Sequence, residues 1–559
     1  MNELKRIFFA LAVAVSLGLI GTSSAIAQYT CTANSVPTLV RTQGLTEATG
    51  TVVLSTCTGP AAAVAAVPFS LTATIQPSSA IITNATTAGF IPTATLVTTP
   101  TNPAGLTTVA TGAGGGVSGN TVTFNLTIPA GDALVSVTLG IVPGNVLTVP
   151  IRVNVSASGV VFPSQIASLL TSSPAGVLAI TNNFLNVAIP QPGLGTGTFT
   201  AGAGIAQCLP RLLTAAPATV GFVANTGPGT LNFTSGTVGA PSSIATSTVR
   251  EGFSTAFQIA GATGEGNDTT GPGTRGTRIL FRIDGLQANV AVYAPQTLTP
   301  AVAAAGSATL TLTLVGGADA SGDLGAPLVA PSAVTANRIT TGTVTYQVMA
   351  SSNAATENIV VPFGFFTIGT PSAGSATVNF ALAAISTFGT PQPIATAPIP
   401  RFADDPRSGA LVTVIGCVTN ILFPFITNQQ GFETGLAIAN TTSDIFGTSS
   451  QSGSCVYNFF GQNAPSGGTF TTPAFAGGAT DVRLLSAVAP AFQGYAIAQC
   501  SFQLGHGYFF VQNGFGSGTA SIAQGGPALI IPQPLVSGVG LGTRVGFASI
   551  APFAEALGH

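Results

Sequence analysis

The chain has very little charge. Only 5% of its 559 residues are Asp, Glu, Lys or Arg, against roughly 25% in an ordinary soluble domain. After Arg6 there is no lysine, and twelve arginines stand against fifteen acidic residues, which leaves a net charge of −3. Such a small net charge creates no field that would attract nucleic acid or anionic lipid. We therefore exclude nucleic acid as a partner and expect hydroxyl, amide and backbone groups to solvate the surface.

Groups that do acid–base chemistry are scarce. The chain has two histidines, His506 and the terminal His559, and it has no GxSxG or HExxH motif. His506 lies between two glycines, so a turn histidine explains it more economically than a general base or a metal ligand. The carboxylates are mostly isolated in polar loops, where the geometry needed for glycosidic cleavage is hard to maintain. The sequence predicts a protein that is not an enzyme.

Long hydrophobic runs are absent as well. The longest run near the start, Ile7 to Ile20, has fourteen residues, whereas a helix that spans a bilayer needs about 20. This run follows Lys5 and Arg6 and precedes Ala25-Ile26-Ala27, the pattern of a secretory signal peptide cleaved before Gln28. We expect a secreted or cell-surface protein whose mature chain has no transmembrane helix.

The six cysteines indicate disulfides. They are even in number, form no CxxC pair, and belong to a chain that the signal peptide directs to an oxidising compartment. Sequence order favours the pairs Cys31–Cys57 and Cys455–Cys500, with Cys417–Cys455 as the main rival. Cys208 and Cys417 would then be bridged to each other or free. Closing the first loop is worth roughly 3 kcal/mol on the chain-entropy model.

Short runs of Val, Ile, Thr and Phe recur about every ten residues between Gly, Pro and Asn, which is typical of β-sandwiches. Alternation predicts strands at 121–128, at 149–155 with Arg152 and Asn154 pointing outward, and at 279–283 with Arg278 and Arg282 on a solvated face. Helical periodicity is confined to 163–170. The predicted fold is all-β, with tandem antiparallel, Ig-like β-sandwich domains after the signal peptide.

Three Pro-Gln-Pro steps, at 190–192, 391–393 and 532–534, divide the mature chain, because proline supplies no donor to a sheet and restrains the preceding residue. We predict a signal peptide at 1–27, N-terminal β domains with a connector at 28–192 and central β-sandwich domains at 193–393. A proline-rich, exposed linker at 394–416 follows, then a C-terminal β-sandwich at 417–534 and a tail at 535–559.

The last block is rich in aromatic residues. From residue 401 onward it holds 16 of the 34 phenylalanines and the tyrosines 457, 495 and 508. We expect most of them to form the core, with an exposed patch as the alternative. If this block binds a ligand, the candidates are Tyr495, His506 and Tyr508.

The loop from Asp319 to Asp323 offers oxygen ligands of the kind that Ca²⁺ prefers, and the loop at 265–268 is similar. Neither loop has EF-hand spacing, and ordinary polar loops explain both more economically. We predict no cofactor, with calcium at Asp319 and Asp323 as the alternative.

Two segments carry a resemblance. Cys31, Arg41-Thr-Gln-Gly-Leu-Thr-Glu47 and Cys57 together resemble the opening module of a family of secreted, β-rich, multidomain bacterial proteins of unassigned function. The stretch from Phe423 to Asn440, with Gly494 to Cys500 and His506-Gly-Tyr508, resembles the closing module of that family. The resemblance implies an extracellular, domain-built protein and implies no activity.

Three functions compete. The first is a non-enzymatic structural or adhesion protein at the cell surface, whose partners are surface or matrix components or further copies joined through strand edges that lack lysine. The second is binding of a polysaccharide or another surface ligand by the aromatic C-terminal block. The third is a secreted hydrolase that uses His506 or isolated carboxylates.

Overall fold

The computed structural model describes most of the chain in separate ranges: 29–59, 67–76, 82–83, 96–101, 110–111, 116–128, 133–139, 151–155, 166–172, 178–182, 184–207, 216–224, 231–234, 241–260, 275–299, 309–323, 325–369, 371–386, 400–416, 418–445, 450–513 and 523–531. The predicted signal peptide, the predicted tail, Cys208 and Cys417 lie outside these ranges. Within the ranges, no helix has the length and apolarity that crossing a bilayer requires.

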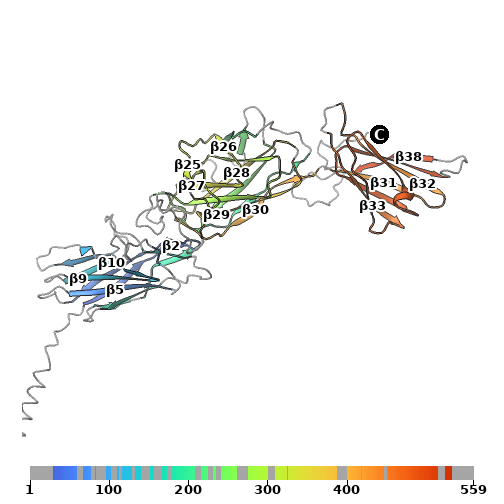
Figure 1. The fold of residues 1–559 in the computed structure, drawn as a ribbon. Coiled ribbons are helices and arrows are strands. Elements are labelled where there is room, and N and C mark those ends of the chain that lie inside the picture. The colour runs from blue at the N-terminus through green and yellow to red at the C-terminus, as the bar shows by residue number, and fades with distance from the viewer. Residues whose placement is uncertain are drawn as a thin grey trace, which may run out of the picture.

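The fold is all-β and is built from three successive groups of packed sheets (Figure 1), so the predicted fold class is confirmed. In the figure the first group is blue to teal, the second runs from green through yellow to the orange strand β30, and the third is orange to red. Most strand pairs are antiparallel. The described exceptions are the parallel pairs β1–β13, β2–β15 and β17–β30, whose bounds are given below.

The first group has two main sheets. The six-stranded sheet has the order β13 (Leu178–Thr181), β1 (Tyr29–Val36), β4 (Thr51–Thr58), β10 (Ala133–Leu139), β6 (Leu96–Thr101), β7 (Ala110–Thr111). The five-stranded sheet has the order β14 (Phe184–Asn186), β12 (Ile166–Ser172), β5 (Val67–Ile75), β9 (Thr121–Ile128), β8 (Gly116–Ser118). Two short pairs complete the group: β11 (Arg152–Val153) with β3 (Glu47–Ala48), and β15 (Ala188–Gln191) with β2 (Thr38–Arg41). Leu54 from one sheet and Leu71 and Val122 from the other belong to one buried cluster.

The second group is the largest. Its seven-stranded sheet has the order β16 (Thr198–Thr200), β20 (Ser243–Arg250), β28 (Asn358–Thr367), β22 (Val290–Pro295), β26 (Thr335–Ile339), β18 (Thr219–Ala224), β19 (Leu231–Thr234). The eight-stranded sheet runs β17 (Ile205–Ala206), β30 (Arg407–Ile415), β29 (Gly374–Ala383), β21 (Arg278–Asp284), β27 (Thr343–Ala350), β24 (Thr311–Gly316), β23 (Thr297–Leu298), with β25 (Ala326–Pro327) beside β24. Phe281 and Phe363 meet between the sheets, edge to face, with ring centroids 5.6 Å apart.

The third group is a smaller sandwich. Its five-stranded sheet has the order β34 (Thr469–Thr471), β33 (Cys455–Gln462), β36 (Gln493–Cys500), β31 (Thr419–Thr427), β39 (Leu529–Ile531). Its four-stranded sheet has the order β35 (Thr480–Leu484), β32 (Phe432–Asn440), β37 (Gly505–Asn513), β38 (Ala523–Pro527), and the one-turn helix α2 (Leu485–Val488) follows β35. Phe423 and Phe509 pack across the sandwich, with centroids 6.2 Å apart.

Several local predictions need correction. The segment 163–170 does not form a helix in its described part, because β12 pairs there with β5 and β14. Arg152 and Asn154 do not point outward, since both are fully buried. The Arg152 guanidinium donates from Nη1 to the carbonyl of Thr46 at 3.2 Å, so it faces a neighbouring loop and not solvent.

The predicted exposed linker at 394–416 is also wrong in its described part. Residues 407–415 form β30, which pairs with β29 in the eight-stranded sheet. Arg401 and Phe402 are fully buried. The cause is a network of contacts around residues 401–405, which reaches both the first and the second group of sheets.

Candidate functional site

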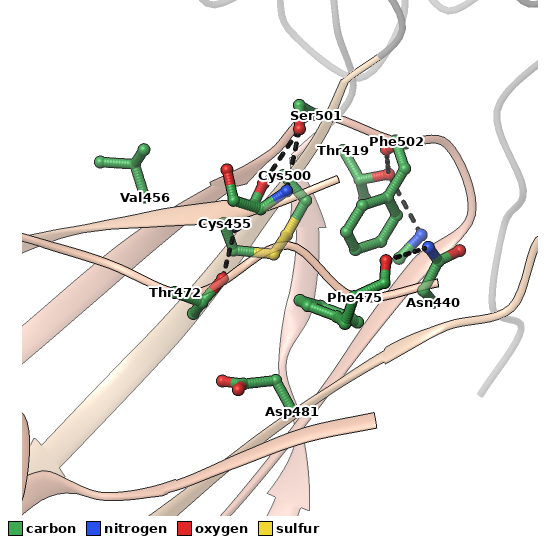
Figure 2. The surroundings of a disulfide bond; sticks show 12 residues. Thr419, Asn440, Cys455, Val456, Thr472, Phe475, Asp481, Cys500, Ser501 and Phe502 are labelled. Atoms are coloured by element: carbon green, nitrogen blue, oxygen red, sulfur yellow. Dashed lines mark hydrogen bonds between the residues drawn. A yellow bond between two sulfur atoms is a disulfide. The ribbon is translucent and has the colours of Figure 1, made fainter. Parts of the chain in front are cut away.

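The two favoured disulfides are present. Cys31–Cys57 joins the neighbouring strands β1 and β4, and Cys455–Cys500 joins residues directly opposite each other on β33 and β36. Figure 2 shows the second bond beside Thr472, whose Oγ1 accepts a hydrogen bond from the Cys455 amide at 2.9 Å. The pairing of Cys455 with Cys500 rules out the rival bond to Cys417.

The predicted calcium loop is occupied by internal contacts. Asp319 Oδ1 accepts hydrogen bonds from the amides of Ser321 and Asp323, both at 3.0 Å, and from the Ser321 hydroxyl at 2.7 Å. Burial raises the pKa of Asp319, but these hydrogen bonds outweigh it and hold the pKa below its usual value. The Asp323 carboxylate is paired with Arg401. In the described ranges, no three His, Cys, Asp or Glu side chains group closely enough to hold a metal ion.

A joint of buried charge connects the first two groups of sheets. Arg41 forms an ion pair with Glu47, Nε to Oε1 at 2.9 Å, and both side chains are buried. Arg41 Nη1 also donates to the carbonyl of Ala256 at 3.0 Å and to the hydroxyl of Thr277 at 3.2 Å, both in the second group. The guanidinium lies 4.7 Å from the centroid of the Phe402 ring. One side chain therefore contacts both groups at once.

The backbone strengthens this joint. The Leu45 amide donates to the carbonyl of Arg401 at 2.9 Å, and the Ala403 amide donates to the carbonyl of Gln43 at 2.8 Å. Gln43 Nε2 also donates to Asp405 Oδ2 at 2.7 Å. The segment 41–47, in which the sequence indicated a resemblance, thus packs against residues 401–405 as a short antiparallel bridge.

Most of the buried charge collects around this joint. Among the described residues, the largest fully buried side chains are four arginines: Arg41, Arg152, Arg278 and Arg401. Arg401 pairs with Asp323, Nη2 to Oδ2 at 2.8 Å, and Arg278 donates to the carbonyl of Asp323 at 3.2 Å. Arg278 is therefore not solvated as predicted, and burial lowers its pKa to about 10. Arg282 is partly exposed and forms a two-pronged pair with Asp404.

A second buried polar cluster lies in the central group. Glu251 Oε1 accepts from the Phe257 amide at 2.8 Å, and Glu251 Oε2 accepts from the Glu357 amide at 3.1 Å. Glu357 in turn accepts from the Thr309 hydroxyl at 2.7 Å. Burial raises the pKa of Glu251 to about 7, although the backbone hydrogen bonds oppose that shift. These carboxylates therefore organise the loops whose backbone amides they accept.

The three predicted ligand residues do not converge. Tyr495 lies on β36 of the five-stranded sheet and is 42% exposed, whereas Tyr508 lies on β37 of the four-stranded sheet and is 51% exposed. His506 is partly buried and precedes Tyr508 by two residues, so both lie on the same face of β37. Tyr495 and Tyr508 therefore occupy opposite outer faces of one sandwich.

Exposed aromatic side chains extend from Tyr495 across its sheet. Tyr495 stacks on Phe460 of β33, with centroids 5.0 Å apart and planes inclined by 16°. On the other side, β31 has a bulge between Phe423 and Ile426 that sets Pro424 and Phe425 opposite Tyr495. Bulges accept proline and re-aim a neighbouring side chain, and Phe425 is half exposed.

A hollow of about 240 Å³ opens beside Phe425. Its apolar lining comes from Phe425, Phe432 and Val511, and its polar lining includes Gln429, Gln430 and Gln493. Gln430 and Gly431 have φ values of 54° and 83°, as the centre of a type I′ turn requires. This turn joins β31 to β32 at the rim of the hollow.

We call Phe425, Phe460, Gln493 and Tyr495, together with this hollow, the aromatic–glutamine face. The sequence analysis named only Tyr495 among these residues. A signal for Phe425 was present, because Pro424 within a strand pattern indicates a bulge. Nothing local marked Gln493, since the hollow also needs Phe432 and Val511 from the opposite sheet.

Comparisons with known proteins give little. No protein-family model matches the chain, and no curated protein matches it. Among solved structures, the CupB6 tip adhesin of Pseudomonas aeruginosa is similar over 70% of this chain and 98% of its own, with 10% identity and a TM-score of 0.16. The partial N-terminal region of an enterococcal surface protein is similar over 70% of this chain and 95% of its own, with 8% identity and a TM-score of 0.16.

The major pilin SpaA of Corynebacterium diphtheriae is similar over 90% of this chain and 92% of its own, with 11% identity and a TM-score of 0.16. At such TM-scores these likenesses carry no argument about function. What this chain does has to be argued from its own residues.

Proposed function

We propose that this protein is a non-enzymatic, extracellular or cell-surface protein with a structural or adhesive role. The charged groups support this proposal, because in the described ranges the buried ones are committed to internal partners. Neighbouring segments are held together by the ion pairs of Arg41 and of Arg401 with Asp323. Backbone amides donate hydrogen bonds to the carboxylates of Glu251 and Glu357. Side chains used in this way hold the fold together, which fits a structural role better than a catalytic one.

The joint between the first two groups of sheets is the observation that carries the proposal. Ordinary contacts between domains are polar and permit relative motion. Here, an ion pair buried on both sides, a cation–π contact and two backbone hydrogen bonds lie in one junction. Buried charges tolerate few alternative arrangements, because each unpaired charge is costly. A firm joint keeps successive sandwiches extended, as a protein that bridges a distance requires.

Strand edges are a weaker route to association. The edge strands β16, β34 and β39 carry no charged residue, so they lack the lysines that discourage pairing with another chain. Each has only three residues, and short edges are themselves a way of limiting such pairing. We therefore propose that the protein contacts its partners mainly through the faces of its sheets. Fibres in electron micrographs would instead indicate association through the strand edges.

The test uses residues 28–559 made with both disulfides. Because this stretch has no lysine, an amine-reactive dye attaches only at its N-terminus and leaves the side chains unmodified. We expect saturable retention of the labelled protein on bacterial cells and no turnover in a broad screen of hydrolase substrates. A monomer that no surface retains, or turnover that His506→Ala abolishes, would contradict the proposal.

A further inference from the structure

We propose that the aromatic–glutamine face binds an uncharged polysaccharide. This inference rests on the proposed function and names the class of partner through which the protein would adhere. It concerns one face of the C-terminal sandwich, formed by β31, β33 and β36, and the hollow at the end of that face.

The first argument is the row of aromatic rings. Phe460, Tyr495 and Phe425 stand on three adjacent strands, and each is between 42% and 50% exposed. Exposed single apolar residues are ordinary, but neighbouring ones form a patch that marks contact with a partner. Phe460 and Tyr495 lie nearly parallel, 5.0 Å apart, and their broad, rigid surfaces bury area at little entropic cost. The apolar faces of sugar rings match such surfaces.

The second argument is the amide groups beside the rings. Gln493 precedes Tyr495 by two residues on β36, so both side chains project from the same face of the sheet. Within the described residues, the side chains of Gln493 and Gln430 have no hydrogen-bond partner. Each amide offers two donors and an acceptor, and sugar hydroxyls both donate and accept. Rings and amides therefore lie side by side on this face, and they match the apolar faces and the hydroxyls of a sugar.

The third argument is the lack of charge. No Arg, Lys, His, Asp or Glu lines the described hollow. The carboxylate of nearby Glu433 accepts hydrogen bonds from the amides of Thr434 and Ser486, both at 3.0 Å, and is already used. An anionic polymer would lose water around its charges without gaining a partner. An apolar protein segment would leave the glutamine amides unpaired. A neutral sugar chain incurs neither cost.

The size of the hollow agrees with a chain that lies across the face. Its volume of about 240 Å³ is below the roughly 300 Å³ at which pockets begin to enclose a whole small molecule. One sugar unit would enter beside Phe425 and Gln430, while the following units would stack along Tyr495 and Phe460.

The experiment measures binding of residues 28–559, with both disulfides, to immobilised polysaccharides by biolayer interferometry. The neutral probes are dextran, starch, galactomannan and a mixed β-glucan, and the acidic probes are alginate and heparin. Tyr495→Ala should weaken binding to the neutral probe about tenfold, since a ring contact is lost. Tyr495→Phe should retain it. Gln493→Ala should weaken binding about fivefold through the lost hydrogen bonds.

Tyr508→Ala is the matched control, because Tyr508 is similarly exposed on the opposite face, and it should bind like the unmodified protein. Three outcomes would overturn the inference: no binding to any neutral probe, binding to the acidic probes alone, or equal losses for Tyr495→Ala and Tyr508→Ala. Retention of the labelled protein on cells distinguishes a failure of this inference from a failure of the proposed function. If Tyr495→Ala is still retained on cells like the unmodified protein, adhesion stands and this face is not its cause.

Discussion

The joint makes the sharpest prediction, through Arg41→Ala. This change removes the ion pair to Glu47, the hydrogen bonds to Ala256 and Thr277, and the contact with Phe402. It also leaves the Glu47 carboxylate buried without its charged partner. Breaking a buried pair on one side costs about 3–5 kcal/mol. For a unit of this size, such a loss lowers the melting temperature by about 10 °C.

Differential scanning calorimetry is the suitable assay, because the chain has no tryptophan to report unfolding by fluorescence. The transition of the C-terminal sandwich serves as an internal control, since no described contact of Arg41 reaches it. The double variant Arg41→Met with Glu47→Leu removes both charges and should recover most of the loss. A loss below about 1 kcal/mol for Arg41→Ala, or no recovery in the double variant, would refute the reasoning.

Three further predictions concern other parts of the chain. Replacing Cys455 and Cys500 by serine opens a loop with a sequence separation of 45 and should lower the unfolding free energy of the C-terminal sandwich by about 4 kcal/mol in urea titrations. Folding raises the pKa of Glu251 to about 7, so the protonated side chain stabilises the folded state. This stabilisation is complete below pH 4.5 and is lost as the pH rises through 7. Thermal melts between pH 5 and 8 should therefore show a fall in stability that Glu251→Gln flattens. On β21, Arg278→Ala should cost about 3 kcal/mol and Arg282→Ala under about 1 kcal/mol in chemical denaturation; equal costs would show that burial does not set them.

Local patterns predicted two of the three expected strands well, because alternation is a property of neighbouring residues. The expected segment 121–128 is β9 with the same bounds, and 279–283 lies within β21, but in the described part of 149–155 only residues 152–153 form a strand. The same alternation failed for Arg152 and Arg278. It says which side chains share a face, but it does not say whether another segment covers that face. Arg278 donates to the carbonyls of Gly322, Asp323 and Gly325, and no pattern on its own strand could indicate them.

The candidate site was predicted only in part for the same reason. Tyr495 and Tyr508 looked equivalent in the sequence, since each follows a glycine near a strand start. They differ because β36 and β37 belong to different sheets, and strand pairing over long sequence separations decides that. Tyr495 stacks on Phe460, 35 positions earlier on β33, and Phe425, 70 positions earlier, lies opposite it on β31; the register of three strands brings these positions together.

The placement of charge links these findings. The chain has few ionisable groups, and several of them are buried around the joint between the first two groups of sheets. Burying charge is costly, so the ion pairs of Arg41 and of Arg401 with Asp323 leave the joint few alternative arrangements. The aromatic–glutamine face has no charge among its named residues and exposes rings and amides instead. Buried charge that fixes geometry and an uncharged face that, on our proposal, meets a partner are complementary uses of a limited set of residues.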